Sequence, residues 1–395
     1  MDEKTLYNKQ FMLLCCITFL ALCNTAVYFN LHPYLMELGI TARHAGFLIG
    51  LYSLASMFFY AFGSKWITSS NSYGCMCLGL LILCVCGNSY MLVRESWLIG
   101  LIRMGSGFGL FLAMASTMVV LVQLIPPHMT GIGFSVFSVA MLLPYSIMPA
   151  VTELASPCIE QPPQLYSLTA LLLLPAAGFA LFRSRQQRAA DGQKKSSTET
   201  THLKKLREKN IRRPTIRGLL WLNGSYFTVF SSQFYLLKGF ATHYGIHHPG
   251  YFFTIQMGVM IALRLTGSGL FDTVNKACLV QIALFCMAAG FGMLPWATSS
   301  LYFFMLAILF GIGMGLCVPP LNALMYQHSV PELRGYNANM MMLAMHFSSF
   351  IGPYIGTWLI VGGGYNLYCF AAVCLMLTGI FVVQRLYKKQ SNSSR

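Results

Sequence analysis

The feature that most constrains this chain is an internal duplication, in which one pattern returns after about 204 residues. The paired segments are 63–71 and 267–275, 105–110 and 311–316, 127–131 and 331–335, and Pro149 with Pro353. These four landmarks keep their order and stay within two residues of one offset. Two parallel copies of a hydrophobic bundle are a common way to build a membrane protein with a site between two halves. The sequence therefore predicts two similar halves around a central site.

Composition places both halves in a membrane. The 395 residues are 56% hydrophobic and only 9% charged, and apolar stretches long enough to cross a bilayer recur along the chain. Period-2 strand patterns are absent, so the prediction is an all-α integral membrane protein with twelve transmembrane helices as two parallel six-helix repeats. The expected spans are 11–37, 44–63, 74–93, 96–123, 130–152, 165–183, 217–242, 248–271, 277–296, 299–326, 334–361 and 364–387.

The net charge of +15 follows the membrane topology rather than a nucleic-acid patch. Lysines and arginines collect on one side of the predicted bundle, whereas the other side has little beyond Arg43, Arg94 and Lys238. This positive-inside pattern predicts an inner (plasma) membrane protein with both termini in the cytoplasm, and no nucleic-acid partner. The basic residues on the predicted inner side are Lys4, Lys9, Lys65, those within 183–217, Lys276, Arg334, Arg385, Lys388, Lys389 and Arg395.

A polar, strongly basic stretch separates the two halves. The predicted division is residues 1–183 for the first six-helix half, 184–216 for a basic cytoplasmic linker and 217–395 for the second half. The linker is too poor in apolar residues to pack as a domain, but residues 202–209 are compatible with a short helix on anionic lipid headgroups. A plain linker is the simpler interpretation, and a regulatory or lipid-binding role is the alternative.

Small residues recur where two helices must approach closely. Three alternate glycines lie in the fourth span and three in the tenth, which predicts tight helix contacts there. They are Gly105, Gly107 and Gly109, and Gly311, Gly313 and Gly315. The GxGxG spacing does not indicate a dinucleotide site, because it lies inside an apolar span rather than after a strand.

Several motifs resemble those of the major facilitator superfamily. The loop motif G-x-x-x-D-x-x-G-[RK] has its counterpart in the second half, where Gly267 or Ser268 begins it and Asp272 is the acid. Asn275 stands at the glycine position and Lys276 at the basic position. The fourth-helix motif R-x-x-x-G is matched by Arg103 and Gly107, and Arg264 is similar to an arginine that many bacterial members carry. The stretch 352–356, Gly-Pro-Tyr-Ile-Gly, resembles the G-P-x-x-G break of the family. The resemblance implies a twelve-helix carrier that works by alternating access and is similar to bacterial efflux-type members.

The chain departs from the family pattern at two places. Thr68 replaces the loop acid in the first half, which by the resemblance would cap the start of a helix in the other half. The fifth span has Met148-Pro149-Ala150-Val151 where exporters often show G-P-x-x-G-G. The first departure implies a weaker contact than the one at Asp272, and the second argues against efflux. The predicted gating residues are Asp272, Lys276, Gly267, Thr68 and Arg334.

Two arginines embedded in apolar spans are the sharpest candidate site residues. Arg103 lies about two turns inside the fourth span, and Arg264 is similarly embedded in the eighth. Arginine at such depth needs a partner or a cavity, and no acidic partner is evident on a neighbouring span. One hypothesis is that both guanidinium groups bind an anionic substrate. The alternative is that both bind helix carbonyl groups.

Other polar residues within the spans are candidates for the cavity lining or the proton path. They are Asn24 and Tyr28 on the first span, Gln233 on the seventh, Gln256 on the eighth, Asn322 on the tenth and His346 on the eleventh. Some of them are expected to be helix-to-helix hydrogen bonds instead. No carboxylate lies near the bilayer centre, so proton coupling would involve Glu153, Asp272 or a histidine such as His32 or His346.

No feature of the sequence predicts an enzyme. There is no nucleophile–base arrangement, no Walker loop and no CxxC pattern, and His243, His247 and His248 lack a further ligand that would complete a metal site. We therefore expect no catalytic residues, no metal and no cofactor.

The leading prediction is a monomeric secondary transporter for proton-coupled efflux of an amphipathic or anionic compound. Proton-coupled uptake of a nutrient or metabolite is the alternative, and a non-transporting membrane receptor or scaffold is the alternative of another class.

Overall fold

The computed structural model describes residues 8–63, 66–125, 130–190, 201–266 and 274–393, and every regular element in these ranges is a helix. The first half contains α1 (Lys9–Ala26), η1 (Val27–Asn30), α2 (Leu31–Glu37), α3 (Ala42–Gly63), α4 (Ser72–Ser89), α5 (Ser96–Leu124), α6 (Thr130–Ala155), η4 (Ser156–Cys158), α7 (Pro162–Leu171) and α8 (Leu173–Ala190). The linker contains α9 (Thr201–Ile211). The second half contains α10 (Pro214–His243), α11 (Gly250–Thr266), α13 (Lys276–Met293), η5 (Leu294–Trp296), α14 (Ser300–His328), η6 (Pro331–Leu333) and α15 (Arg334–Ser393).

The helices agree with the predicted spans. Nine helical segments in the described residues are long and apolar enough to cross a membrane, and one of them, 331–386, is 56 residues long. That segment lies mostly in α15, whose backbone leaves the helical region at Gly363 and Gly364, between the two predicted spans 334–361 and 364–387. This break divides the segment into two spans. The helix α10 and the shorter helix α11, which are not among the nine segments, add two more. The arrangement is therefore consistent with twelve spans. Helices satisfy the backbone polar groups internally, which lipid cannot do.

The duplication is visible in the helix boundaries. The helices α4 and α13 are both 18 residues long, and α5 and α14 are both 29 residues long. Both pairs keep the sequence offset of about 204 residues. Asn71 precedes α4 and Asn275 precedes α13, so both copies have an asparagine at the N-cap position. The repeat seen in the sequence is therefore a repeat of structure.

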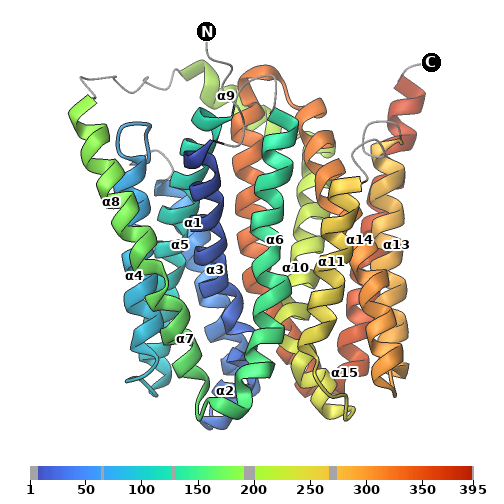
Figure 1. Ribbon diagram of the computed structural model, residues 1–395. Coiled ribbons are helices and arrows are strands. Elements are labelled where there is room, and N and C mark those ends of the chain that lie inside the picture. The colour runs from blue at the N-terminus through green and yellow to red at the C-terminus, as the bar shows by residue number, and fades with distance from the viewer. Residues whose placement is uncertain (1–7, 64–65, 126–129, 191–200, 267–273, 394–395) are drawn as a thin grey trace.

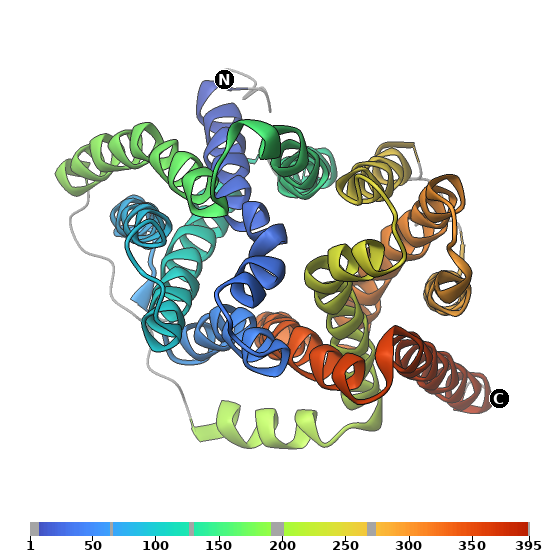
Figure 2. The same ribbon diagram turned by 90° about the horizontal axis from the view of Figure 1, so that it is seen from below.

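The two halves lie side by side (Figure 1). The described ends of the chain and α9 lie at one end of the bundle, here called the termini face. The opposite end, here called the distal face, carries the loops 38–41, 244–249 and 297–299. Figure 2 shows the halves meeting where α3 contacts α15 and where α6 contacts α11.

The predicted glycine contacts are confirmed. A Cβ atom at Gly109 would lie 2.9 Å from the carbonyl oxygen of Gly79, so α4 and α5 approach through paired glycines. In the second half, a Cβ atom at Gly313 would lie 2.9 Å from the carbonyl oxygen of Ala283 on α13. The two copies therefore use alternate glycines for the same purpose, which is close backbone contact.

The linker helix α9 matches the short helix expected at 202–209. Hydrogen bonds between buried side chains join its C-terminal end to the second half. The Asn210 side chain donates to Asn337 Oδ1 at 2.7 Å, and Asn337 Nδ2 donates to Ser329 Oγ at 2.6 Å. Arg213, just after α9, donates to the carbonyl oxygen of His328 at 3.1 Å. The helix α8 runs to Ala190 and α10 begins at Pro214, so these helices extend seven and three residues into the predicted linker 184–216.

Candidate functional site

The centre of the first half contains a buried cation. Arg103, on α5, is 1% exposed, and one of its terminal nitrogens donates to the carbonyl oxygen of Ile49 on α3 at 2.9 Å. Its guanidinium carbon lies 4.8 Å from the ring centre of Tyr52 and 5.2 Å from that of Tyr28. Its Nε has no hydrogen-bond partner among the described residues. The carbonyl and the ring faces offset part of the charge, but neither is an anion.

Three tyrosines form an aromatic cluster next to Arg103. Tyr28 of η1, Tyr90 at the end of α4 and Tyr166 of α7 have ring centres 4.6–5.4 Å apart. The hydroxyl groups of Tyr28 and Tyr166 are buried and have no hydrogen-bond partner within the described part of the chain. Together with Arg103 Nε, they give a group of unpaired donors to which no carboxylate of the described residues is bound. Buried polar groups are usually paired, so this cluster is suited to accept electron-rich oxygen atoms.

The second arginine has different described neighbours from the first. Arg264, on α11, is half-buried, and its Nε has no hydrogen-bond partner among the residues described. Its electrostatic neighbour is Tyr226 of α10. Arg103 contacts residues of α3 and η1 and also has an electrostatic neighbour on α10, Tyr235. The described contacts of the two arginines share no residue. The hypothesis of one anion held by both guanidinium groups therefore stays a prediction, and the carbonyl alternative accounts for one bond of Arg103.

Three of the predicted polar residues form helix-to-helix hydrogen bonds inside one half. Asn24 donates to Thr169 Oγ1 at 3.4 Å, and Gln233 donates to Gln256 Oε1 at 3.2 Å. The Gln256 side chain in turn donates to the sulfur of Met314 at 2.8 Å. Gln233 and Gln256 are fully buried, so this pair joins α10 to α11 at the core of the second half.

The remaining two polar candidates have different surroundings. Asn322, on α14, is exposed. His346, on α15, is buried and stacks on the ring of Tyr60 from α3, with ring centres 4.9 Å apart. Of the six polar candidates, His346 is the one with a described ring contact between the two halves.

The predicted gating residues are only partly described. Asp272 and Gly267 lie outside the described residues. Thr68 has its bonds within its own turn, because its backbone N–H donates to Asn71 Oδ1 at 2.8 Å and its hydroxyl pairs with that of Ser70 at 2.9 Å. The described hydrogen bonds of Thr68 thus do not include the start of a helix in the other half.

The two basic gating candidates lie at helix starts. Lys276 is the first residue of α13, and Arg334 is the first residue of α15. The guanidinium carbon of Arg334 lies 4.0 Å from the ring centre of Tyr326, within the second half. These placements are at the termini face, where the gating prediction puts them, but they do not test the role.

A polar seam between the halves was not predicted. Near the distal face, Lys238 of α10 donates to Asn30 Oδ1 at 2.7 Å, and the backbone N–H of Gly250 donates to Glu153 Oε1 at 2.7 Å. One turn deeper, Thr254 Oγ1 donates to the carbonyl oxygen of Ser146 at 2.7 Å. Glu153 and Lys238 were visible in the sequence as charges near span ends in opposite halves. Their partners are an amide and a backbone group, which no charge pattern indicates.

An aromatic layer lies beside this seam. The ring of Phe29, from η1, lies 5.9 Å from that of Phe234 on α10 and 5.2 Å from that of Phe253 on α11. Tyr145 of α6 adds a contact to Phe234 at 5.4 Å. Polar and aromatic contacts therefore hold the halves together near the distal face.

The geometry defines a class of protein. Two repeated helical halves meet at a seam near one face, and a buried arginine with unpaired donors lies inside one of them, which is the architecture of a membrane carrier. The model of the Major Facilitator Superfamily matches residues 13–342. The chain belongs to this superfamily, and it is a multi-pass membrane transporter rather than an enzyme.

Curated relatives match only part of the chain. A multidrug resistance protein MdtH of Aeromonas hydrophila is 29% identical over 124 residues, which are 31% of this chain and 30% of the relative. The MdtH protein of Proteus mirabilis is 25% identical over 138 residues, 35% of this chain and 33% of the relative. The match thus spans about a third of the length of these relatives.

Solved structures show the same fold over nearly the whole chain. A POT family transporter in complex with a thioalcohol-conjugated peptide has a TM-score of 0.78 at 12% identity, covering 98% of this chain and 97% of that one. The human organic anion transporter MFSD10 has a TM-score of 0.67 at 16% identity, covering 94% and 98%. The nucleoside transporter NupG has a TM-score of 0.74 at 13% identity, covering 95% and 99%. At these identities the likeness concerns the fold alone.

Proposed function

We propose that this carrier exports a small amphipathic or anionic compound by alternating access, driven by inward proton flow. The proposal that the compound is anionic rests on Arg103. This arginine is a buried cation whose unpaired Nε lies beside the unpaired hydroxyls of Tyr28 and Tyr166. An oxyanion entering this cluster would supply the acceptors that the described residues do not. The surrounding tyrosine rings suit an apolar or aromatic body on the same compound.

Export is supported by the partial match to multidrug resistance proteins. The charge distribution supports a cytoplasmic termini face, because Arg183, Lys276, Arg334 and Arg385 all lie toward it. We place the chain in the inner (plasma) membrane as a monomer with both termini inside. Uptake is the second candidate, since POT-family and nucleoside transporters share the fold.

The test uses inverted membrane vesicles, in which export appears as accumulation. The vesicles are energised so that the interior is acidic, and they receive either carboxyfluorescein as an anion or ethidium as a cation. With wild-type protein we expect carboxyfluorescein to accumulate and a protonophore to abolish the accumulation. Accumulation that occurs only in right-side-out vesicles would establish uptake instead, and no transport in either orientation would favour the receptor alternative.

Variants of Arg103 test the proposed anion-binding site independently of the direction of transport. A charge-assisted hydrogen bond contributes about 1.5–3 kcal/mol, so Arg103→Gln should lower anion transport roughly tenfold to a hundredfold. Arg103→Lys keeps the charge and should retain more activity, while Arg185→Gln removes an exposed charge of α8 and serves as the control. Normal transport by Arg103→Gln would show that this arginine only binds helix α3, and would leave the export proposal standing.

A further inference from the structure

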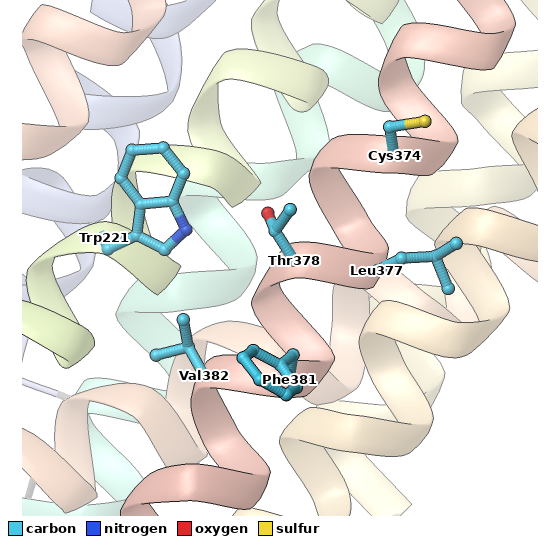
Figure 3. Close-up of a pocket in the computed structure, with 6 residues that line it drawn as sticks. All are labelled: Trp221, Cys374, Leu377, Thr378, Phe381 and Val382. Atoms are coloured by element: carbon cyan, nitrogen blue, oxygen red, sulfur yellow. The ribbon is translucent and has the colours of Figure 1, made fainter.

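An apolar groove runs along the outer surface of the second half. It encloses about 610 Å³ between α10 and the last part of α15, away from the seam between the halves. Figure 3 shows Trp221 on α10 facing Thr378 of α15 across it. The lining residues are Trp221, Cys374, Leu377, Thr378, Phe381 and Val382.

The groove follows from the packing of the two helices. A Cβ atom at Gly218 would lie 2.9 Å from Leu386 Cδ1 and 3.3 Å from Val382 Cγ1, so α10 and α15 touch there. The large side chains of Trp221 and Phe381 line the groove, and each is 51% exposed. An open channel with apolar walls therefore remains on the surface of the protein.

Two cations lie at the end of this groove toward the termini face. Arg217 precedes Trp221 by one helical turn on α10, and Arg385 follows Phe381 by one turn on α15. Both arginines are exposed. The guanidinium carbon of Arg385 lies 4.2 Å from the ring centre of Phe381, and Arg217 Nε donates to the carbonyl oxygen of Ile211 at 3.1 Å. Neither α10 nor α15 contains an acidic residue, so these helices do not cancel the positive charge.

We propose that this groove binds an anionic phospholipid, with an acyl chain against Trp221 and Phe381 and the headgroup phosphate at Arg217 and Arg385. An apolar channel that ends at two cations matches a molecule with an apolar chain and a negative head. Basic pockets between membrane helices are a known way to select such lipids. The transported compound would instead pass between the halves. A second copy of the chain is disfavoured, because a two-fold contact here would bring the four arginines of two copies together.

The test places a single reporter in the groove. The chain has five tryptophans, and replacing Trp66, Trp97, Trp296 and Trp358 by Phe leaves Trp221 as the only one. This variant is reconstituted in phosphatidylcholine vesicles that contain an increasing fraction of lipid with brominated chains. The brominated lipid is either phosphatidylglycerol or phosphatidylcholine, and the quenching of Trp221 fluorescence is measured.

We expect brominated phosphatidylglycerol to reach half-maximal quenching at a roughly thirtyfold lower mole fraction, the order that two basic residues near a headgroup produce. Arg217→Gln/Arg385→Gln should remove this preference. The control Arg185→Gln/Arg212→Gln removes two other exposed arginines, one at the end of α8 and one just after α9, and should keep it.

Three outcomes would overturn the proposal. Equal quenching by both lipids would show an unselective lipid contact, and a preference that survives Arg217→Gln/Arg385→Gln would place the selectivity elsewhere. Quenching by neither lipid would also contradict it, and would show that a second copy of the chain covers the groove. The measurement does not depend on transport, so its result is independent of the proposed function.

Discussion

The contact between α3 and α15 near the distal face includes a glycine of α3, Gly46. A Cβ atom at Gly46 would lie against Thr357 Oγ1 and 2.7 Å from the carbonyl oxygen of Pro353. The second of these atoms belongs to the backbone and does not rotate away. Gly46→Ala therefore prevents the two helices from closing to the distance seen here, and we expect it to favour the conformation that is open at the distal face.

The size of this effect can be estimated from the crowding. Adding a methyl group to a closely packed contact typically costs about 1–3 kcal/mol. This cost applies only to the closed distal face, because separation of α3 from α15 removes the contact. The ratio of open to closed molecules should then rise roughly 5- to 150-fold. Gly258→Ala on α11 is the matched control, since no atom lies within 4 Å of the position that its added methyl carbon would occupy and the gain in helix propensity is similar.

Pulsed electron spin resonance measures the effect directly. Spin labels are attached through Arg94→Cys and Thr298→Cys, two exposed loop positions of the distal face in opposite halves. The exposed native cysteines Cys16, Cys158 and Cys278, together with Cys374, are replaced first. Gly46→Ala should add or enlarge a long-distance population, while Gly258→Ala should leave the wild-type distribution. If the two alanine variants give the same distribution, the packing of Gly46 does not control closure and the reasoning is wrong.

Two further substitutions test the packing of the second half. Asn337→Leu removes the acceptor of Asn210 and the donor to Ser329, and each lost partner costs about 1–3 kcal/mol, so the melting temperature in detergent should fall well below that of Asn339→Leu. Gly364 has φ 72° and ψ −174°, a conformation that residues with a Cβ atom rarely adopt, so Gly364→Ala should cost about 1–3 kcal/mol, whereas Gly362→Ala should be close to neutral. Equal melting of either variant and its control would contradict the corresponding interpretation.

The architecture could be predicted from the sequence because it depends on patterns that a chain shows locally. Span length, apolar content and the repeated landmarks identified the helices, and the boundary predicted between 361 and 364 coincides with the break at Gly363 and Gly364. The alternate glycines also indicated their contacts, because small residues at helical spacing have few other uses in lipid. These features require no knowledge of which helices become neighbours.

The candidate site was less predictable because its partners come from other helices. The depth of Arg103 in its span showed that it needs a partner, but not that this partner is the carbonyl of Ile49 on α3. Gln233 and Gln256 were predicted as cavity or helix-contact residues, and only the structure shows that they bind each other. The bond from the Gly250 amide to Glu153 involves a backbone group, which has no signal in a sequence.

The repeat explains why the fold was more predictable from the sequence than the candidate site. The helices α5 and α14 have the same length and keep the common offset, so Arg103 in the first copy corresponds to Ala307 in the second. Ala307 is fully buried and packs as a small apolar residue, whereas Arg103 places a positive charge among tyrosines. Equivalent positions thus share their backbone setting and differ in chemistry. A search for transport residues in a duplicated carrier is therefore best directed at buried positions where one copy is charged and the other is not, because packing alone would accept the same small residue in both.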